Sequence, residues 1–397
     1  MINSILDNDL YKFTMQQAVL KKYPDAQVTY QFNARRKAAI NDAFKTRVEG
    51  VVNSLADLQL TSDESEFLSE KCHFLNPSYL GYLSQYRFNP DEVKIEWGDD
   101  LTTTNLNISG PWHRTILWEV PLMAILSESY FEKVDTNWTL DGQAEKAFDK
   151  AKHLTGHHIK FSDFGTRRRR SHDVQDIVVD NLICGSTDNS LMGTSNVYFA
   201  MKHGLRPIGT MAHEWIMGIS ALESLRHANR YALNGWNDVY QGSLGIALTD
   251  TFGTDAFFED FDAILARLFD GVRHDSGDPF EFANKTVQFY KNINIPTKTK
   301  TIVFSDSLTV DKAVDLMIHC RKLGIGCAFG IGTHFTNDFF NSPALNMVIK
   351  LRSIAKSSSD PFVQVVKLSD DLGKATGDLD ALRVAKYTFF GTPLDEN

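Results

Sequence analysis

Short apolar runs that end in polar or glycine-rich loops recur from about residue 157 onward, and an amphipathic helical pattern usually follows each loop. The helical pattern is clear over Thr309–Leu323, where apolar residues form one stripe and Gly324 marks the stop. Strands that alternate with helices predict parallel βα units. Seven apolar runs are predicted strands: Ile159–Phe161, Leu182–Cys184, Pro207–Gly209, Leu244–Leu248, Phe269–Val272, Thr301–Phe304 and Gly326–Phe329.

The predicted fold class is α/β. Seven βα units with polar residues after the strands favour an irregular (β/α) barrel with an anion-binding face. A doubly wound open sheet is the competing architecture. It would place a glycine fingerprint after its first strand, and the chain contains no G-x-G-x-x-G.

Both ends of the chain have a different pattern. Strand-like segments occur at Val28–Phe32, Val93–Trp97 and Phe362–Val366, outside the barrel pattern. We therefore predict a second α/β domain built from both termini, residues 1–130 together with 345–397, and a barrel over residues 131–344 that carries the binding sites.

Composition narrows the class of protein. The formal net charge of −9 argues against nucleic acid as the main partner, since that binding depends on neutralising phosphates. No apolar stretch approaches the about 20 residues of a membrane helix, and two acids precede any apolar run at the N-terminus. The four cysteines have no zinc-ligand spacing. We expect a cytoplasmic protein whose ligands are small molecules, with no nucleic acid or membrane partner.

Residues 271–278 concentrate candidate chemistry. Arg273 can grip anionic oxygens, and Gly277 lets the backbone approach a phosphate closely. Asp275, Ser276 and Asp278 can hold Mg²⁺ or sugar hydroxyls. A phosphorylated sugar carried with a metal fits this set, although a polar turn after a strand would also explain it.

Seven motifs, in order along the whole chain, resemble those of the nicotinate phosphoribosyltransferase family. They are Asp7-Asn-Asp-Leu-Tyr-Lys12, Phe161-Ser-Asp-Phe-Gly-Thr-Arg-Arg168, Gly193-Thr-Ser-Asn196, Thr210-Met-Ala-His-Glu-Trp215, Val272-Arg-His-Asp-Ser-Gly-Asp-Pro279, Phe304-Ser-Asp-Ser307 and Ala328-Phe-Gly-Ile-Gly-Thr333. The resemblance implies an enzyme of NAD biosynthesis, a ligase that forms a C–N bond. It joins nicotinate to 5-phosphoribosyl 1-diphosphate, giving nicotinate mononucleotide and diphosphate, with ATP as co-substrate and Mg²⁺ as cofactor. A homodimer is one assembly that the resemblance allows.

The resemblance assigns the catalytic step to His213, which ATP phosphorylates in this family, together with Asp275. Neutral imidazole is a competent nucleophile. A histidine beside a tryptophan is otherwise more often a buried core residue. His274 is the rival phosphoryl acceptor and a poorer match to the family pattern.

By the same resemblance, Tyr11 and Phe164 sandwich the pyridine ring, and Arg167 lies near both its substituent and the 5′-phosphate. In dimeric relatives the tyrosine reaches into the partner's site. Relatives that use nicotinamide carry an aspartate where this chain has Ser195, beside Thr194. Hydroxyls donate to a carboxylate that an aspartate would repel, so this pair favours nicotinate. Which of Arg168, Arg169 and Arg170 contact ligand stays open.

The remaining predicted contacts are to the phosphoribosyl group. Arg273 binds phosphate and Asp275 the ribose hydroxyls, with further contacts from Ser276, Gly277, Ser305, Asp306, Ser307, Gly330, Gly332 and Thr333. Mg²⁺ is assigned to Asp275, Asp278 or Asp250 without a choice among them. The alternatives are a nicotinamide or quinolinate phosphoribosyltransferase and a non-catalytic sugar-phosphate sensor.

Overall fold

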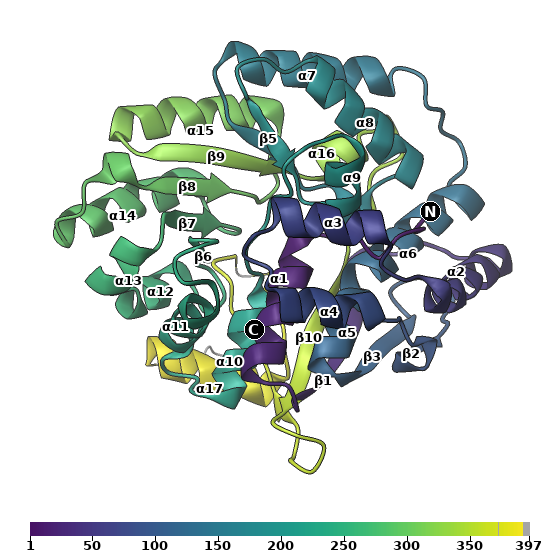
Figure 1. The fold of residues 1–397 in the computed structure, drawn as a ribbon, viewed down its shortest axis with the longest axis horizontal. Coiled ribbons are helices and arrows are strands. Elements are labelled where there is room, and N and C mark those ends of the chain that lie inside the picture. The colour runs from purple at the N-terminus through teal and green to yellow at the C-terminus, as the bar shows by residue number, and fades with distance from the viewer. Residues whose placement is uncertain (372, 392–397) are drawn as a thin grey trace.

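The strands of this computed structural model, which describes residues 1–371 and 373–391, form two sheets (Figure 1). The parallel sheet has the order β5-β4-β9-β8-β7-β6. Its strands are β4 (Phe161–Asp163), β5 (Leu191–Thr194), β6 (Ile246–Leu248), β7 (Gly271–His274), β8 (Thr301–Phe304) and β9 (Gly326–Ile331). The antiparallel sheet has the order β11-β10-β1-β3-β2. Its strands are β1 (Gln27–Ala34), β2 (Val93–Glu96), β3 (Asn105–Pro111), β10 (Met347–Ala355) and β11 (Val363–Gln364).

Helices α12 to α15 lie around the outer side of strands β6 to β9 (Figure 1). The helices of this half are α7 (Gln143–Gly156), α8 (His172–Cys184), α9 (Val197–Lys202), α10 (His213–Leu222), α11 (Ala228–Tyr240), α12 (Thr254–Asp260), α13 (Ala263–Leu268), α14 (Pro279–Asn292), α15 (Val310–Leu323) and α16 (Thr333–Thr336). Helix α15 begins and ends as predicted, because the Thr309 side chain caps its first turn and Gly324 adopts a left-handed φ of 72°.

The α/β class and the parallel sheet are confirmed, but two predicted strands are wrong. Residues Leu182–Cys184 end helix α8, and the strand follows at β5. The segment around Pro207 makes only an isolated bridge to Thr194. It still lies between the two edge strands, since Ile208 N donates to Thr194 O (2.9 Å) and Thr210 Oγ1 to Ile246 O (3.2 Å). The barrel is therefore irregular at this position in the part of the chain described.

Both ends of the chain contribute to the antiparallel sheet. Strand β1 lies between β3 and β10, so residues more than 300 positions apart are paired, such as Gln27 with Ala355. The predicted strand at Phe362–Val366 is shorter, since only Val363–Gln364 pairs with β10. The helices outside the barrel half are α1 (Leu10–Lys22), α2 (Asp42–Ser54), α3 (Ser62–Lys71), α4 (Pro77–Gln85), α5 (Trp112–Thr115), α6 (Glu119–Lys133) and α17 (Leu379–Phe390).

Helix α1 joins the two halves. It is buried from Leu10 to Val19 on all sides, which explains why its sequence shows little amphipathic pattern. The Leu10 N–H donates to Ser195 O (2.8 Å), directly after β5. The N-terminal residues therefore lie at the carboxyl ends of the parallel strands.

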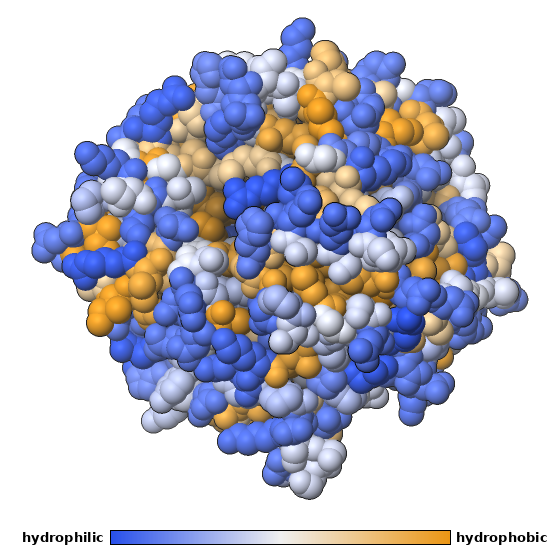
Figure 2. All heavy atoms as spheres, viewed as in Figure 1, coloured by the Kyte–Doolittle hydropathy of each residue, from blue (hydrophilic) through white to orange (hydrophobic). Residues whose placement is uncertain are grey.

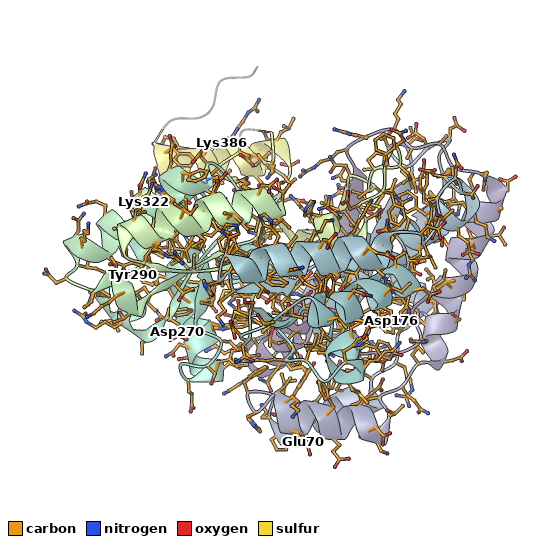
Figure 3. The ribbon with its side chains drawn as sticks, turned by 90° about the horizontal axis from the view of Figure 1, so that it is seen from above. Glu70, Asp176, Asp270, Tyr290, Lys322 and Lys386 are labelled. Carbon is orange, nitrogen blue, oxygen red and sulfur yellow. The ribbon has the colours of Figure 1, made fainter. Side chains whose placement is uncertain are left out.

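The outer surface is mixed in character. On the face shown in Figure 2, hydrophobic residues are interspersed among hydrophilic ones, as on most water-exposed surfaces. Figure 3 shows α3, marked by Glu70, and α17, marked by Lys386, on opposite sides of the molecule. None of the described helices combines the length and hydropathy needed to cross a bilayer.

Candidate active site

A pocket with an empty volume of about 580 Å³, counted out to its open mouth, lies at the carboxyl ends of the parallel strands. We refer to it as the aromatic pocket. Its walls come from α1, from the loops after β4 and β5, from the segment at 208–210 and from β6 to β8. The lining residues are Asp9, Tyr11, Phe164, Arg167, Ser195, Ile208, Gly209, Thr210, Ile246, Arg273 and Val303.

Two aromatic rings of the same chain line this pocket. Tyr11 lies in the first turn of α1, and Phe164 directly follows β4, where its N–H donates to Ile331 O (2.8 Å). A side chain at Gly330 would overlap the Phe164 ring, so this glycine provides the space for the ring. The buried Tyr11 hydroxyl has no hydrogen-bond partner among the described residues.

The four consecutive arginines have different environments. Arg167 lines the aromatic pocket, while Arg169 is buried and paired with Asp7 (2.7 Å). Arg170 is buried with its guanidinium 3.5 Å from the centre of the Phe131 ring. Arg168 is half-buried, and burial together with Arg167 lowers its pKa to about 10. Of these arginines, Arg167 is the one available to a ligand in the aromatic pocket.

The two hydroxyls predicted at the pyridine substituent differ in position. Ser195 lines the aromatic pocket, but its Oγ donates to Asp9 Oδ1 (2.7 Å). Thr194 is fully buried and donates to Asp163 Oδ2 (2.8 Å), so it supports the pocket wall and does not line it. The carboxyl of Asp9 also lines the pocket, and burial raises its pKa.

A second group of polar side chains surrounds His213, the first residue of α10. Its Nε2 lies 3.0 Å from Asp275 Oδ2, 3.6 Å from Asp250 Oδ1 and 2.9 Å from Lys367 Nζ. Its Nδ1 lies 3.0 Å from Thr251 Oγ1. We call His213, Asp250, Asp275 and Lys367 the histidine cluster.

Burial and Lys367 favour a neutral imidazole in this cluster, and the neighbouring cations favour ionised carboxylates. Burial and then Lys367 lower the pKa of His213. Burial alone would raise the pKa of Asp275, but Arg273 and His213 outweigh it and hold that pKa well below its usual range. A neutral imidazole beside two carboxylates can act as a nucleophile or accept a metal.

Arg273 connects the two groups. It lines the aromatic pocket, and its NH2 group lies 3.1 Å from Asp275 Oδ1. Its Nε donates to Ser305 Oγ (2.9 Å), at the end of β8. The guanidinium therefore lies between the aromatic pocket and the histidine cluster, where an anion that bridges them would be bound.

The segment after β11 lies against the loop after β7. Ser276 Oγ donates to Asp250 Oδ2 (2.6 Å) and accepts from Asp370 N (3.1 Å). Gly277 has a φ of 80°, and its N–H donates to Asp371 Oδ1 (3.2 Å). A Cβ atom at Gly277 would lie 3.0 Å from Asp370 Cβ, so glycine permits this close approach.

Comparison with known proteins identifies the family. A model of the nicotinate phosphoribosyltransferase (NAPRTase) family matches residues 159–392, and one of its N-terminal domain matches residues 6–127. The chain belongs to the nicotinate phosphoribosyltransferase family. It is 48% identical over 420 residues to the nicotinate phosphoribosyltransferase of Methanosarcina mazei, covering 100% of both chains. It is 43% identical to a probable nicotinate phosphoribosyltransferase of Schizosaccharomyces pombe, covering 97% of each.

Solved structures of the family have the same fold. The crystal structure of nicotinate phosphoribosyltransferase from Porphyromonas gingivalis matches with a TM-score of 0.95 at 39% identity, covering 98% of this chain and 100% of that one. A structure of a putative nicotinate phosphoribosyltransferase from Saccharomyces cerevisiae matches with a TM-score of 0.91 at 36% identity, covering 98% of both. The recognition of the family from its motifs is confirmed.

The other residues predicted for the family's phosphate site lie around the same strand ends. Ser307 adopts a left-handed φ of 48°, a conformation that suits glycine better. Asp306 Oδ2 pairs with Lys374 (3.0 Å). Gly332 precedes the short helix that begins at Thr333. These residues stay predictions as phosphate ligands.

Two sequence alternatives have clear structural positions. Asp278 caps helix α14 by accepting from Phe280 N and Glu281 N (both 2.8 Å), and it lies outside the histidine cluster. His274 is buried, with its ring 5.1 Å from that of Phe282. Both positions favour local structural roles over metal binding or phosphorylation.

Several charged residues at the site were missed by the sequence analysis. Asp9 lies in the motif Asp7–Lys12, in which Tyr11 was the predicted site residue. Lys367 directly follows the apolar run that ends at Val366 and precedes a polar loop, which is the same pattern as at the predicted barrel strands. Lys350 lies nearby on β10, and burial together with Lys367 and Arg35 lowers its pKa to about 7.

Proposed function

We propose that this chain joins nicotinate to 5-phosphoribosyl 1-diphosphate, giving nicotinate mononucleotide and diphosphate, and that ATP hydrolysis drives the reaction through a phosphate on His213. The observation that carries this proposal is the aromatic pocket joined to the histidine cluster through Arg273. A flat aromatic acid fits the aromatic pocket, and phosphate groups with a metal cation fit the histidine cluster.

The aromatic pocket suits the pyridine base. Tyr11 and Phe164 provide ring faces for stacking, and Arg167 provides a cation for the carboxylate. A single cation matches the one carboxylate of nicotinate better than it matches the two carboxylates of quinolinate. The pyridine nitrogen is itself the nucleophile toward the anomeric carbon, so binding and orientation are the main tasks of the pocket.

The histidine cluster suits phosphoryl transfer. If Nδ1 donates its proton to Thr251 Oγ1, the lone pair lies on Nε2, where it accepts from Lys367 Nζ (2.9 Å). Exchange of that contact for the γ-phosphorus of ATP would form the N–P bond and break the bond to the bridging oxygen, with ADP as the leaving group. Lys367 and the amino end of α10 both favour negative charge at this position.

The cluster also offers ligands for Mg²⁺. Oδ1 of the fully buried Asp250 has no hydrogen-bond partner within residues 1–371 and 373–391, and Asp275 lies beside it. Two carboxylates of this kind fit a hard cation, so we assign Mg²⁺ to Asp250 and Asp275. Held there, Mg²⁺ would supply charge neutralisation for the departing diphosphate.

The predicted domain boundaries and the predicted homodimer are part of this proposal. We infer one unit from residues 1–130 with 345–397 and another from 131–344. Tyr11 and Phe164 of one chain line the same pocket, which supports a base site that does not require a partner's tyrosine. A homodimer stays a prediction, as does the cytoplasmic location.

A direct assay tests the proposed function. The purified protein is incubated with nicotinate, 5-phosphoribosyl 1-diphosphate, Mg²⁺ and ATP, and products are measured by mass spectrometry. We expect nicotinate mononucleotide, diphosphate and ADP, with less product when ATP is omitted. Absence of the mononucleotide under all conditions would contradict the proposal.

Ser195→Asp is expected to weaken the use of nicotinate. The new carboxylate would lie beside Asp9 in the aromatic pocket and repel the carboxylate of the base. A mispaired buried polar group costs about 1–3 kcal/mol, so kcat/KM for nicotinate should fall by roughly 5- to 150-fold. Steady-state kinetics with nicotinate and nicotinamide would measure this change. An unchanged ratio between the two bases would show that Ser195 does not face the substituent.

Lys367→Met is expected to shift the acidic limit of phosphorylation to higher pH. Attack on ATP needs neutral His213, so the rate is present above the pKa of this imidazole and falls as the pH drops through it. Lys367 lowers that pKa, and its loss leaves Asp250 and Asp275 free to raise it. Initial rates of phosphate incorporation against pH would show the shift. Lys374→Met, from the same segment, should leave the limit unchanged because Lys374 pairs with Asp306 and Asp371.

A further inference from the structure

Four side chains of alternating charge form a row from the aromatic pocket into the interior. Arg167 NH1 donates to Glu119 Oε1 (3.2 Å). Glu119 Oε2 lies 2.5 Å from Lys12 Nζ, and the same Nζ lies 2.5 Å from Glu214 Oε2. We call Arg167, Glu119, Lys12 and Glu214 the charge row.

Only the pocket end of the charge row is substantially exposed. The exposed fraction of the side chain is 44% for Arg167, 12% for Glu119 and 0% for Lys12. At the inner end, Glu214 Oε1 accepts from Tyr30 and from Trp112 Nε1 (2.8 Å). Each inner charge is thus paired, and the row is fixed to helices α1, α6 and α10.

This arrangement favours the charged forms of Glu119 and Lys12. Burial alone would raise the pKa of Glu119, but Lys12 and Arg167 outweigh it and hold that pKa below its usual value. Burial alone would lower the pKa of Lys12, yet the two carboxylates raise it. Removing one partner of such a buried pair leaves an uncompensated charge, so the geometry of the row is strongly constrained.

The row determines which donors Arg167 can offer. A guanidinium has five N–H donors in a fixed plane, and Glu119 accepts from one of its nitrogens, NH1. The carboxyl of Asp9, also in the pocket, is bonded to Ser195 and does not replace Glu119 as the anchor. A guanidinium held in this way presents its remaining donors in a defined direction, as recognition of a carboxylate requires.

Resting on the proposed function, we propose that Glu119 is a positioning residue for the substrate carboxylate. It orients Arg167 toward the base, and Lys12 in turn fixes Glu119. Neither residue lines the aromatic pocket. They therefore act on how Arg167 holds the base carboxylate, and neither is paired with Arg273 or Asp275, to which the phosphoribosyl group is assigned.

A buried carboxylate on the same helix provides a matched control. Glu128 also lies on α6, is 5% exposed and pairs with a buried arginine, Arg169 (2.8 Å). Arg169 does not line the aromatic pocket. Glu119→Gln and Glu128→Gln therefore make the same chemical change in comparable surroundings, and only the first acts on an arginine that faces the base.

The test compares steady-state kinetics of the full chain and the two variants with nicotinate, nicotinamide and 5-phosphoribosyl 1-diphosphate. For Glu119→Gln we expect KM for nicotinate to rise by about 10- to 100-fold, because a charge-assisted contact is lost. KM for the sugar diphosphate should rise by a smaller factor than KM for nicotinate, and the preference for nicotinate over nicotinamide should fall. Glu128→Gln should leave the base preference unchanged, and Glu119→Asp should recover part of it.

Equal changes in KM for nicotinate in the Glu119→Gln and Glu128→Gln variants would overturn the proposal, since the effect would then be one of general stability. A folded Glu119→Gln variant with an unchanged base preference would overturn it as well. Thermal unfolding of each variant identifies any loss of fold. If Glu119→Gln does not fold, the same kinetic comparison is made with Glu119→Asp, and an unchanged base preference in that variant would overturn the proposal. Failure of the wild-type chain to make nicotinate mononucleotide would instead refute the proposed function.

Discussion

His213→Ala is expected to abolish both the incorporation of phosphate from ATP and the stimulation of the reaction by ATP. His213 Nε2 lies between Lys367 and Asp275, and burial and Lys367 keep its pKa low. Loss of the imidazole removes the phosphoryl acceptor. The aromatic pocket and the phosphate-site loops stay in place, so a slow transfer without ATP should persist.

The chemistry of the label distinguishes this acceptor from others. A phosphate on a histidine nitrogen survives alkali and is lost in mild acid, because protonation of the ring makes imidazole a good leaving group. The control is His274→Gln, at the rival histidine packed against Phe282 and Phe304. We expect labelling to persist in that variant. Labelling that survives in His213→Ala and disappears in His274→Gln would reverse the assignment.

Asp275→Asn is expected to lower kcat/KM by about 100- to 1,000-fold, the scale of removing one fixed electrostatic contact at a reacting centre. One carboxylate oxygen contacts His213 Nε2, and the other accepts from Ser305 Oγ (2.7 Å) and from Arg273. An amide carries no charge, so Arg273 would lose its ion-pair partner. One of the two carboxylates assigned to Mg²⁺ would be lost too.

Asp278→Asn is the matched control for this change. Asp278 lies three residues further along, and its side chain caps α14, a role that asparagine fulfils equally well. We expect kcat/KM within about threefold of the wild-type value. Titration of Mg²⁺ against activity should show that a higher Mg²⁺ concentration is needed only for Asp275→Asn. A comparable loss in both variants would argue that the loop as a whole, and not Asp275, determines the rate.

The sequence predicted most barrel strands because parallel strands buried on both faces are short apolar runs followed by polar residues. It failed at Leu182–Cys184 because a short apolar run at the end of a helix has the same appearance. It also failed at Pro207–Gly209. Proline lacks the N–H for a strand ladder, and a Cβ at Gly209 would lie 3.0 Å from the Tyr11 nitrogen, so this segment is shaped by its contact with α1.

At the site, too, the sequence predicted only residues that carry a local signal. Residues within a motif, such as Phe164, His213 and Asp275, could be predicted because the motif itself carries the resemblance. Glu119 lies outside these motifs. An apolar run precedes Lys367, but the run does not reveal the partner of this lysine, His213, which is 154 residues away in sequence. Contacts of this kind have no local signal, and the fold alone brings them together.

The most direct measurement of the central claim is a competition assay analysed by mass spectrometry. Equimolar nicotinate, nicotinamide and quinolinate are offered together with 5-phosphoribosyl 1-diphosphate and Mg²⁺, with and without ATP. We expect nicotinate mononucleotide as the main product, with more of it when ATP is present and ADP formed alongside. A main product from nicotinamide or quinolinate would contradict the assignment of the base, and binding of the sugar diphosphate without any nucleotide product would indicate a sugar-phosphate sensor.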